Sequence, residues 1–336
     1  MICPQCTATV GRADRFCESC GHELAGRRIA LPRHESGLPG PCRGCGATDY
    51  DADGYCLACG ELRGAPDRFE ADLGAVAVVT DRGIMHAHNE DAVAAAVLDD
   101  IALIVVADGV STSEDPQAAS GAAAGTGVEA ARIALAEGKS APGAAMVALA
   151  AAAEAVRAVA VHDGQAPSCT YVSAIVRHGP DGVDITIANV GDSRAYWLRA
   201  DDADAPGNAP SQQLTVDDSW AQALVDAGAL DAGSAMEDPR AHTLLRWLGA
   251  DSGPKPWSDN CIRTLRTTGP GVLLVCSDGL WNYLPDPAAL AAVATGADPM
   301  SAARELVEFA LRCGGSDNIT VALAPVPWSA PSGEIS

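Results

Sequence analysis

The chain has 336 residues, of which 48% are hydrophobic and 20% charged, and its formal net charge is −22 at pH 7. This length predicts one large domain with a small addition, or two domains, and the apolar content suffices for a buried core. The acidic charge argues against bulk nucleic-acid binding, because it repels phosphate backbones. The sequence has no apolar run of the length that a membrane helix needs, and its start, MICPQCTATVGR, lacks the features of a signal peptide, so we expect a cytoplasmic protein.

The N-terminal region contains an internal repeat of cysteine pairs. The pattern CxxC-x10-CxxC occurs twice, and the second copy is shifted by 39 residues. Cysteines of a cytosolic protein are more often metal ligands than disulfides, and four thiolates favour a closed, tetrahedral, structural zinc site. The repeat resembles the zinc-ribbon class and predicts two structural Zn²⁺ ions, held by Cys3, Cys6, Cys17 and Cys20 and by Cys42, Cys45, Cys56 and Cys59.

We therefore predict one zinc ribbon at residues 1–25 and a second at residues 40–62, joined by a linker. A ribbon this short cannot build a core, so metal binding must provide its folding energy. Crossed pairing of the ligands between the two repeats is a less economical alternative. Through residue 62 the chain has six Arg against eight Asp plus Glu, a nearly neutral balance that favours docking to a protein over binding to nucleic acid.

The chain after about residue 73 has the composition of a mixed α and β domain. Short runs rich in Val and Ile predict strands, and Ala-rich stretches near 117–137 and 143–162 predict helices. Strands and helices come in neighbouring pairs, which favours an α+β fold with largely antiparallel sheets. Residues 327–336 have the composition of a flexible tail. The four cysteines outside the repeat are predicted to be small buried residues: Cys169, Cys261, Cys276 and Cys313.

Five segments of this domain place an acidic residue at a strand end or a turn. Each alone is typical of an ordinary turn, whereas five together favour a single convergent site. Carboxylates crowded into one site repel one another unless cations neutralise them. Oxygen ligands without a His–Cys set indicate magnesium or manganese. The segments are HAHNEDA (86–92), VVADGVS (105–111), NVGDSRAY (189–196), VCSDGLW (275–281) and GGSDNITV (314–321).

These five segments, in this order, resemble the signature motifs of the metal-dependent (type 2C) serine/threonine protein phosphatase family. The resemblance covers roughly residues 72–325 and extends to LTVDDSW (214–220) and LLRWLG (244–249). It implies a catalytic domain at residues 70–326, built as an αββα sandwich of two antiparallel sheets flanked by helices. It also implies hydrolysis of phosphoserine and phosphothreonine in proteins, by a water activated between two Mn²⁺ or Mg²⁺ ions about 4 Å apart.

The resemblance assigns roles to individual carboxylates. Asp108 matches the ligand that bridges both metals, and the carbonyl of Gly109 completes the shell of one of them. Glu90 and Asp91 match the pair that supports that metal, partly through water. The other metal is matched by Asp278 and Asp317, and Asp192 matches the residue that, with the carboxylate at position 278, can hold a third metal. Ser277 and Asn318 are expected to orient the neighbouring carboxylates or to close turns.

Two positions depart from the family pattern. His86 stands where members usually have an Arg that clamps the substrate phosphate, so phosphate binding is assigned to His86 with a lower expected affinity. Val110 stands where some members have a His that acts as general acid. The leaving group must then be protonated from elsewhere, by water on a metal or by His86 or His88, unless both histidines are only surface or supporting residues.

Three functions compete at this point. The first is an active phosphatase that acts on phosphorylated proteins, with a cognate Ser/Thr kinase as a natural partner and the ribbons as a docking module. The second is a pseudophosphatase or scaffold that binds phosphoproteins and acts through its ribbons, an alternative that the exchange at His86 supports. The third, a zinc-ribbon nucleic-acid protein, is disfavoured by charge. Retention of every metal-binding carboxylate favours the first.

Overall fold

The computed structural model describes residues 6–9, 17–20, 28–29, 45–49, 56–60, 67–98, 100–159, 166–179, 182–200, 210–267 and 269–326. The predicted zinc ligands Cys3 and Cys42, and the tail predicted at 327–336, lie outside the described residues. No helix among the residues described is both long enough and apolar enough to cross a membrane.

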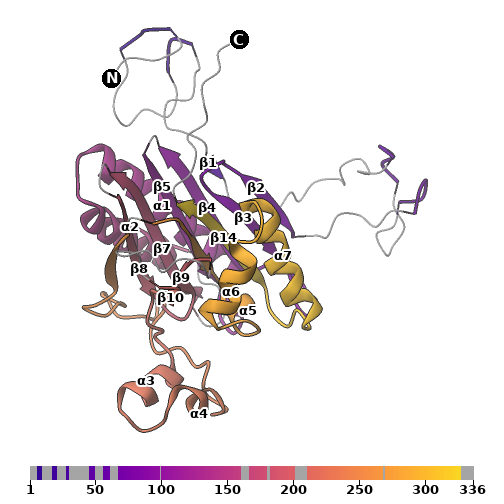
Figure 1. Ribbon diagram of the computed structural model, residues 1–336, viewed down its shortest axis with the longest axis vertical. Helices are drawn as coiled ribbons and strands as arrows, with labels where there is room; N and C mark the ends of the chain where they lie inside the picture. The colour runs from indigo at the N-terminus through magenta and orange to yellow at the C-terminus, as the bar shows by residue number, and fades with distance from the viewer. Residues whose placement is uncertain are drawn as a thin grey trace.

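Two six-stranded antiparallel sheets form the centre of the structure (Figure 1). The first has the strand order β1-β4-β5-β7-β8-β12. Its long strands are rich in Val, Ile and Ala and are buried along most of their length, as expected for strands covered on both faces. Their bounds are β1 Arg28–Ile29, β4 Asp91–Leu98, β5 Ile101–Asp108, β7 Tyr171–Gly179, β8 Gly182–Val190 and β12 Ile262–Thr267.

The second sheet has the strand order β10-β9-β13-β14-β3-β2. Its bounds are β2 Phe69–Asp72, β3 Ala77–Asp81, β9 Arg194–Leu198, β10 Gln212–Gln213, β13 Gly271–Cys276 and β14 Ile319–Val326. A separate two-stranded ladder joins β6 (Ser168–Cys169) to β11 (Leu248–Gly249). The two large sheets pack face to face over a core of Val, Ile, Leu and Ala side chains from both, which includes Ile104, Val172 and Val275.

Helices cover the outer face of each large sheet. On the first sheet, α1 (Pro116–Ala136) and α2 (Ala141–Arg157) bury small side chains against β5 and β7. On the second, α5 (Asp278–Trp281), α6 (Pro287–Ala294) and α7 (Pro299–Arg312) bury Leu and Ala side chains against β13 and β14. The arrangement is the αββα sandwich that the sequence predicted, and Figure 1 shows its layers.

Local sequence explains where these helices begin. Ser140, Asp286 and Asp298 precede α2, α6 and α7, and each side chain accepts a hydrogen bond from a backbone N–H of the first turn. A proline follows within the first two positions in all three helices, where its missing N–H costs nothing. These starts end the short connections between consecutive helices, from α1 to α2, from α5 to α6 and from α6 to α7.

One segment protrudes from the sandwich. The short helices α3 (Trp220–Asp226) and α4 (Ala232–Met236) pack on one another around Ala221, Ala235 and Ala241, and Figure 1 shows them away from the two sheets. The chain returns from this α3–α4 segment through residues 242–247 to β11. Residues 242–247 therefore connect a small separate cluster to the centre of the molecule.

Two details differ from the sequence interpretation. Cys169, Cys261 and Cys276 are buried as predicted, but the prediction for Cys313 is wrong, because this residue ends α7 at the surface. In addition, β1 lies in the linker predicted between the cysteine repeats, and its residues pair with Ala95 and Ala96 of β4. The edge of the first sheet is therefore covered by a strand from outside the predicted catalytic domain, as edge strands often are.

Candidate metal centres

Four of the carboxylates singled out in the sequence line one cavity, whereas Glu90 and Asp91 are not among its lining residues. This cavity has a volume of ≈ 510 Å³ and lies where the ends of the two sheets meet the return of the α3–α4 segment. Five acidic side chains from distant parts of the chain line it, and no Lys or Arg is among the lining residues that the structure describes. The acidic residues are Asp108, Asp192, Asp251, Asp278 and Asp317.

Asp108 is the last residue of β5, and the next residue must be a glycine. The backbone N–H of Asp108 donates to Thr170 Oγ1 at 3.0 Å. A Cβ at Gly109 would lie 2.7 Å from the carbonyl oxygen of Pro116 and 2.8 Å from that of Glu90. Any side chain would therefore push the chain away, so glycine lets the loop after Asp108 pass close to these carbonyls.

Asp91 faces Asp108 across the ladder between β4 and β5. Its Oδ2 accepts hydrogen bonds from Ser277 Oγ and Thr320 Oγ1, both at 2.7 Å. Its Oδ1 is buried without a hydrogen-bond partner among the described residues. A buried carboxylate oxygen in this condition costs free energy unless a cation or water meets it.

Asp278 follows β13, and Asp317 precedes β14, the strand that pairs with β13. Asp278 begins α5 directly after β13, and a Cβ at the following Gly279 would collide with the backbone of Asn318. Asn282 donates to Asp278 Oδ2 at 3.0 Å, whereas Asp278 Oδ1 is buried and has no partner in the described part of the chain. The backbone N–H of Asn318 donates to Asp317 Oδ1 at 2.8 Å. The second orphaned oxygen thus belongs to a residue that lines the cavity.

The pKa values of these carboxyls are raised. Burial raises the pKa of Asp91 to about 7 and of Asp278 to about 6, and the neighbouring charge of Asp317 adds to both shifts. Burial also raises the pKa of Asp108 well above its ordinary value, with further increases from the charges of Asp91 and Asp278. The group cannot be fully ionised near neutral pH without cations, and its all-oxygen donor set suits hard divalent ions such as Mg²⁺ and Mn²⁺.

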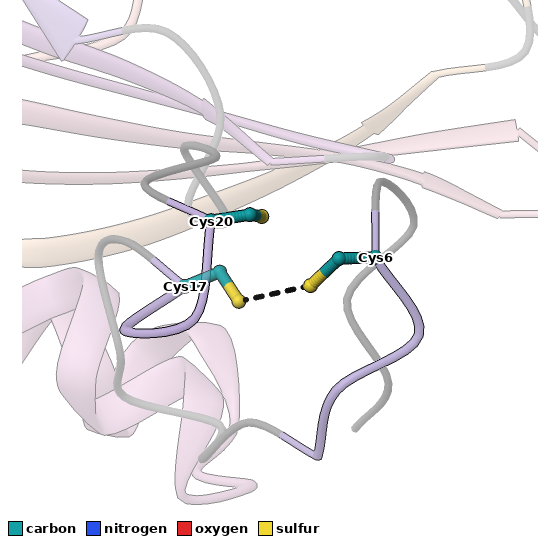
Figure 2. Close-up of side chains that lie close together, drawn as sticks. All are labelled: Cys6, Cys17 and Cys20. Atoms are coloured by element: carbon teal, nitrogen blue, oxygen red, sulfur yellow. Dashed lines mark hydrogen bonds between the residues drawn. The ribbon is translucent and has the colours of Figure 1, made fainter.

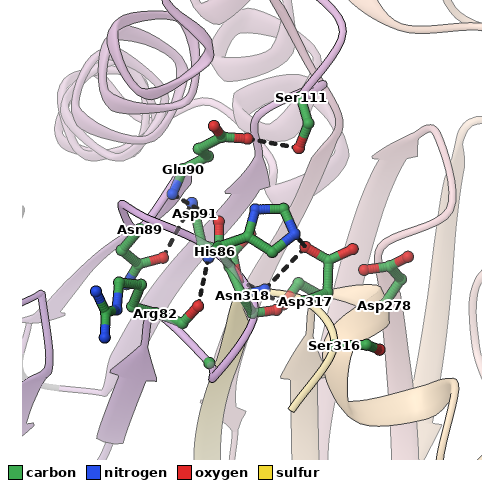
Figure 3. Close-up of polar contacts among 12 residues, drawn as sticks. Arg82, His86, Asn89, Glu90, Asp91, Ser111, Asp278, Ser316, Asp317 and Asn318 are labelled. Atoms are coloured by element: carbon green, nitrogen blue, oxygen red, sulfur yellow. Dashed lines mark hydrogen bonds and ion pairs between the residues drawn. The ribbon is translucent and has the colours of Figure 1, made fainter. Parts of the chain in front are cut away.

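Glu90 and His86 lie beside this cluster (Figure 3). Glu90 Oε2 accepts a hydrogen bond from Ser111 Oγ at 2.6 Å, and Ser111 itself lines the cavity. His86 Nε2 lies 3.2 Å from Asp317 Oδ1. His88 instead faces Asp67, and 66% of its side chain is exposed. Of the two histidines that the sequence offered as acids, only His86 therefore contacts the carboxylate cluster.

His242, which no sequence motif indicates, also lines the cavity. Ligand atoms of Asp192, His242 and Asp278 lie within 4.8 Å of one another, a spacing that can hold a metal ion. The ring of His242 stacks on Trp281 with centroids 5.8 Å apart. Trp281 is fixed in turn, because its Nε1–H donates to the carbonyl of Asp192 at 2.9 Å and the guanidinium of Arg194 lies 3.5 Å from its ring centroid. A single histidine in the connection from α4 to β11 forms no sequence motif, so only the fold shows that it lies near Asp192 and Asp278.

The arrangement can be compared with known proteins. A family model described as Protein phosphatase 2C matches residues 83–310, a range that holds all but the last of the five acidic segments. The chain belongs to the protein phosphatase 2C family. The last acidic segment, which carries Asp317 and Asn318, follows the matched range and joins the same cavity in the structure.

Curated members of the family are similar to part of the chain. A serine/threonine phosphatase stp of Listeria welshimeri is 35% identical over 154 residues, which are 46% of this chain and 55% of the relative. The serine/threonine protein phosphatase PstP of Mycobacterium tuberculosis is 33% identical over 147 residues, 43% of this chain and 26% of the relative. The chain thus spans about half, or less, of the length of these relatives.

Solved structures of the family match more of the chain. The PPM Ser-Thr phosphatase MsPP of Mycobacterium smegmatis, in complex with cacodylate, is 29% identical with a TM-score of 0.58, over 74% of this chain and 97% of that one. The catalytic domain of PstP in complex with two manganese ions is 26% identical with a TM-score of 0.57, over 75% and 97% of the two chains. The fold is therefore that of the phosphatase family.

The cysteine repeat lies before the part that matches the family model. In the first copy, ligand atoms of Cys6, Cys17 and Cys20 lie within 4.8 Å of one another (Figure 2), and the Cys6 and Cys17 sulfurs are 3.4 Å apart. Burial raises the pKa of Cys17, but hydrogen bonds from the backbone at Ser19 and Cys20 and from Cys6 outweigh it and lower the pKa to about 6. A thiol of this kind is ready to act as a thiolate ligand.

The second copy repeats this geometry. Ligand atoms of Cys45, Cys56 and Cys59 also lie within 4.8 Å of one another, and the Cys45 and Cys56 sulfurs are 3.5 Å apart. Gly46 and Gly60 follow two of these cysteines with positive φ, as expected for tight turns around a metal. Three thiols of each copy are thus in place for one ion, and the fourth predicted ligand of each lies outside the described residues.

Proposed function

We propose that the chain is a metal-dependent protein phosphatase that hydrolyses phosphoserine and phosphothreonine in proteins. The observation that carries the proposal is the convergence of Asp108, Asp278 and Asp317 on one cavity, with Asp91 buried beside Asp108. One buried oxygen each of Asp91 and Asp278 lacks a partner among the described residues. Family membership, the names of the curated relatives and the two manganese ions of a solved relative support it.

The residues divide into two proposed metal shells. Asp108, the carbonyl of Gly109 and the Glu90–Asp91 pair would hold one ion, and Asp278 and Asp317 would hold the other, with Asp108 between them. Asp192 and Asp278 would hold a third ion, and His242 lies within reach of it. When bound, two such ions provide a water of lowered pKa as the nucleophile and offset the charge on the phosphoryl oxygens.

The protein's own residues position these groups. Ser277 and Thr320 hold one oxygen of Asp91, which leaves its other, buried oxygen as a candidate metal ligand. Asn318 orients Asp317 through its backbone N–H, and its side-chain amide donates to the carbonyls of Arg82 and His88. That amide ties the loop bearing His86 to the loop bearing Asp317. His86 is then placed to bind a substrate phosphate beside Asp317.

The test is hydrolysis of p-nitrophenyl phosphate and of a phosphothreonine peptide by the full chain. We expect activity that requires added Mn²⁺ or Mg²⁺ and that disappears in Asp278→Asn. The matched control is Asp259→Asn, which removes the same charge from an exposed ion pair with Lys255, away from the residues that line the cavity. Activity that needs no metal, or that survives in Asp278→Asn, would contradict the proposal.

The cysteine clusters favour a second component of the function. Each cluster is proposed to hold one structural Zn²⁺ and to form a ribbon that docks a phosphoprotein or a partner kinase, and cysteine usage of this kind supports a cytoplasmic location. In the alternative scaffold function, the chain would bind phosphoproteins through these ribbons without turnover. Two zinc equivalents per chain in metal analysis would support the ribbons, and absence of hydrolysis despite bound phosphoprotein would support the scaffold.

A further inference from the structure

A second polar group lies on the wall of the cavity, apart from the metal-binding carboxylates. Trp247 and Asp251 flank β11 and both line the cavity that holds Asp108 and Asp278. The Nε1–H of Trp247 donates to Asp251 Oδ1 at 2.9 Å, which fixes the carboxylate beside the indole ring. Trp247 is half-buried and Asp251 is exposed, so a ligand in the cavity can reach both.

Backbone pairing connects this group rigidly to the metal site. Gly109 pairs with Cys169 of β6, and Cys169 pairs on its other side with Leu248 of β11. Neighbouring strands lie about 4.8 Å apart, so Leu248 is about 10 Å from Gly109. An extended peptide advances about 3.3 Å per residue, so the Trp247–Asp251 pair lies about three residues from a phosphorylated residue held at the metals.

The charge of the cavity indicates what this group binds. The described residues that line it include five Asp but no Lys or Arg. Divalent ions bound by Asp108, Asp278 and Asp317 would offset the charge of the central carboxylates, whereas Asp251 is held by an uncharged tryptophan. No Lys or Arg among the described lining residues therefore offsets the charge of Asp251, so a cation of the substrate can do so. A carboxylate at the edge of an indole ring suits a guanidinium or an ammonium group, which can contact the ring face and reach the carboxylate at its edge.

We propose that Trp247 and Asp251 form a subsite for an Arg or Lys side chain of the substrate, about three residues from the phosphorylated Ser or Thr. The inference rests on the proposed phosphatase function and adds a substrate class to it: phosphoproteins with a basic residue near the phosphosite. The apolar stem of the cation packs along the indole ring, while its charged end meets Asp251 Oδ2.

The experiment compares three phosphothreonine peptides that differ at two positions. One has Arg three residues before the phosphothreonine, one has Arg three residues after it, and one has Ala at both. We expect kcat/KM of the full chain with Mn²⁺ to be about five- to ten-fold higher for one Arg peptide than for the Ala peptide. The advantage should shrink as salt is raised, because an exposed charge pair is screened.

Variants assign the effect to the subsite. Asp251→Asn should reduce the Arg advantage to about two-fold or less and leave kcat/KM for the Ala peptide within about two-fold, since a neutral amide no longer attracts the cation. Trp247→Leu should reduce the advantage in the same way, because it removes the ring face. Asp259→Asn, which loses the same charge outside the cavity, should keep the full advantage.

Each outcome decides the matter. Equal kcat/KM for all three peptides, or an Arg advantage that survives in Asp251→Asn, overturns the subsite even though the phosphatase function holds. If no peptide is hydrolysed, the proposed function fails instead. The subsite is then judged by the affinity of the same peptides, labelled with a fluorophore, for the full chain and for Asp251→Asn, whose folding is checked by thermal melting.

Discussion

The side chains of the carboxylate cluster and those of the cysteine clusters are brought together in opposite ways. The carboxylates come from positions as distant as Asp91 and Asp317, and two packed sheets bring them together. The cysteines of the first copy lie between Cys3 and Cys20, and the buried residue among the described ones is Cys17 itself. Where a core already fixes the ligands, metal can leave without loss of the fold, whereas a short segment without a core depends on its metal for structure.

The largest expected effect concerns the carboxylate cluster. Asp108→Asn should lower kcat for p-nitrophenyl phosphate by about 10³-fold, because it weakens the ligand proposed to bridge both metals. The melting temperature of the metal-free protein should not fall, since the change replaces a carboxyl whose charged form is disfavoured by burial and by its acidic neighbours. The measurements are steady-state kinetics and thermal melting in EDTA. Loss of the fold in this variant would show that the carboxylates, and not the sheets, organise the site.

The second-largest expected effect concerns the cysteine clusters. Cys17→Ser should reduce the zinc affinity of the first cluster by at least about 100-fold and leave kcat for p-nitrophenyl phosphate within about two-fold. The matched variant is Cys56→Ser, which stands at the equivalent position of the second copy. Each variant should lose one zinc equivalent in metal analysis. Loss of both equivalents in either variant would indicate that the two copies share ligands, which is the crossed pairing that the sequence left open.

The stability that bound metal adds through the carboxylate cluster should depend on pH. Folding raises the pKa of Asp91 to about 7 and of Asp278 to about 6, mainly through burial. Their protonated forms therefore contribute to the stability of the metal-free fold. This contribution is fully present below pH 4 and is lost as pH rises through 6 to 7. Bound Mn²⁺ offsets this loss. We expect Mn²⁺ to raise the melting temperature by about 5 °C more at pH 7.5 than at pH 5.5. An equal increase at both values would contradict a repulsive, metal-dependent cluster.

His86→Arg gives a smaller effect within the carboxylate site. An Arg fork is permanently charged and bidentate, so KM for a phosphopeptide should fall by about ten-fold, with a smaller change in kcat. His88→Arg is the matched control, because His88 is largely exposed and faces Asp67 rather than the cluster. If KM is unchanged in His86→Arg, or falls equally in His88→Arg, His86 does not bind the phosphate.

The two regions also differ in how far the sequence predicted them. The Val-rich runs predicted β5, β7, β8 and β13, and the motifs at strand ends singled out Asp108, Asp192, Asp278 and Asp317, which line the cavity, because strand pattern and turn chemistry are local. The Ala-rich β4 carried no such pattern and is a strand because it pairs with β5 in the core. His242 could not be found, since its neighbours Asp192 and Asp278 approach it only through the tertiary fold.

The cysteine spacing predicted each cluster directly, but it did not reveal a difference between the two copies. Gly46 follows Cys45 with φ 76°, a conformation that glycine adopts freely, whereas Thr7 at the equivalent position of the first copy has φ 60°. A left-handed conformation costs a side-chain-bearing residue about 1 kcal/mol, and a β-branched one is especially disfavoured. The turn of the first copy therefore carries a strain that the second copy lacks, and the proposed zinc would have to bind against it.

The smallest expected effect follows from this difference. Because metal binding and folding are coupled in a segment without a core, relief of the strain should appear as zinc affinity. Thr7→Gly should raise the affinity of the first cluster by about five-fold, and Gly46→Thr should lower that of the second by about the same factor. Competition with a chromophoric chelator measures both, and the double exchange should reverse the order in which the clusters release zinc. If the order does not change, the residue after Cys6 or Cys45 contributes no strain, and the zinc affinities of the two copies differ for a reason outside this position.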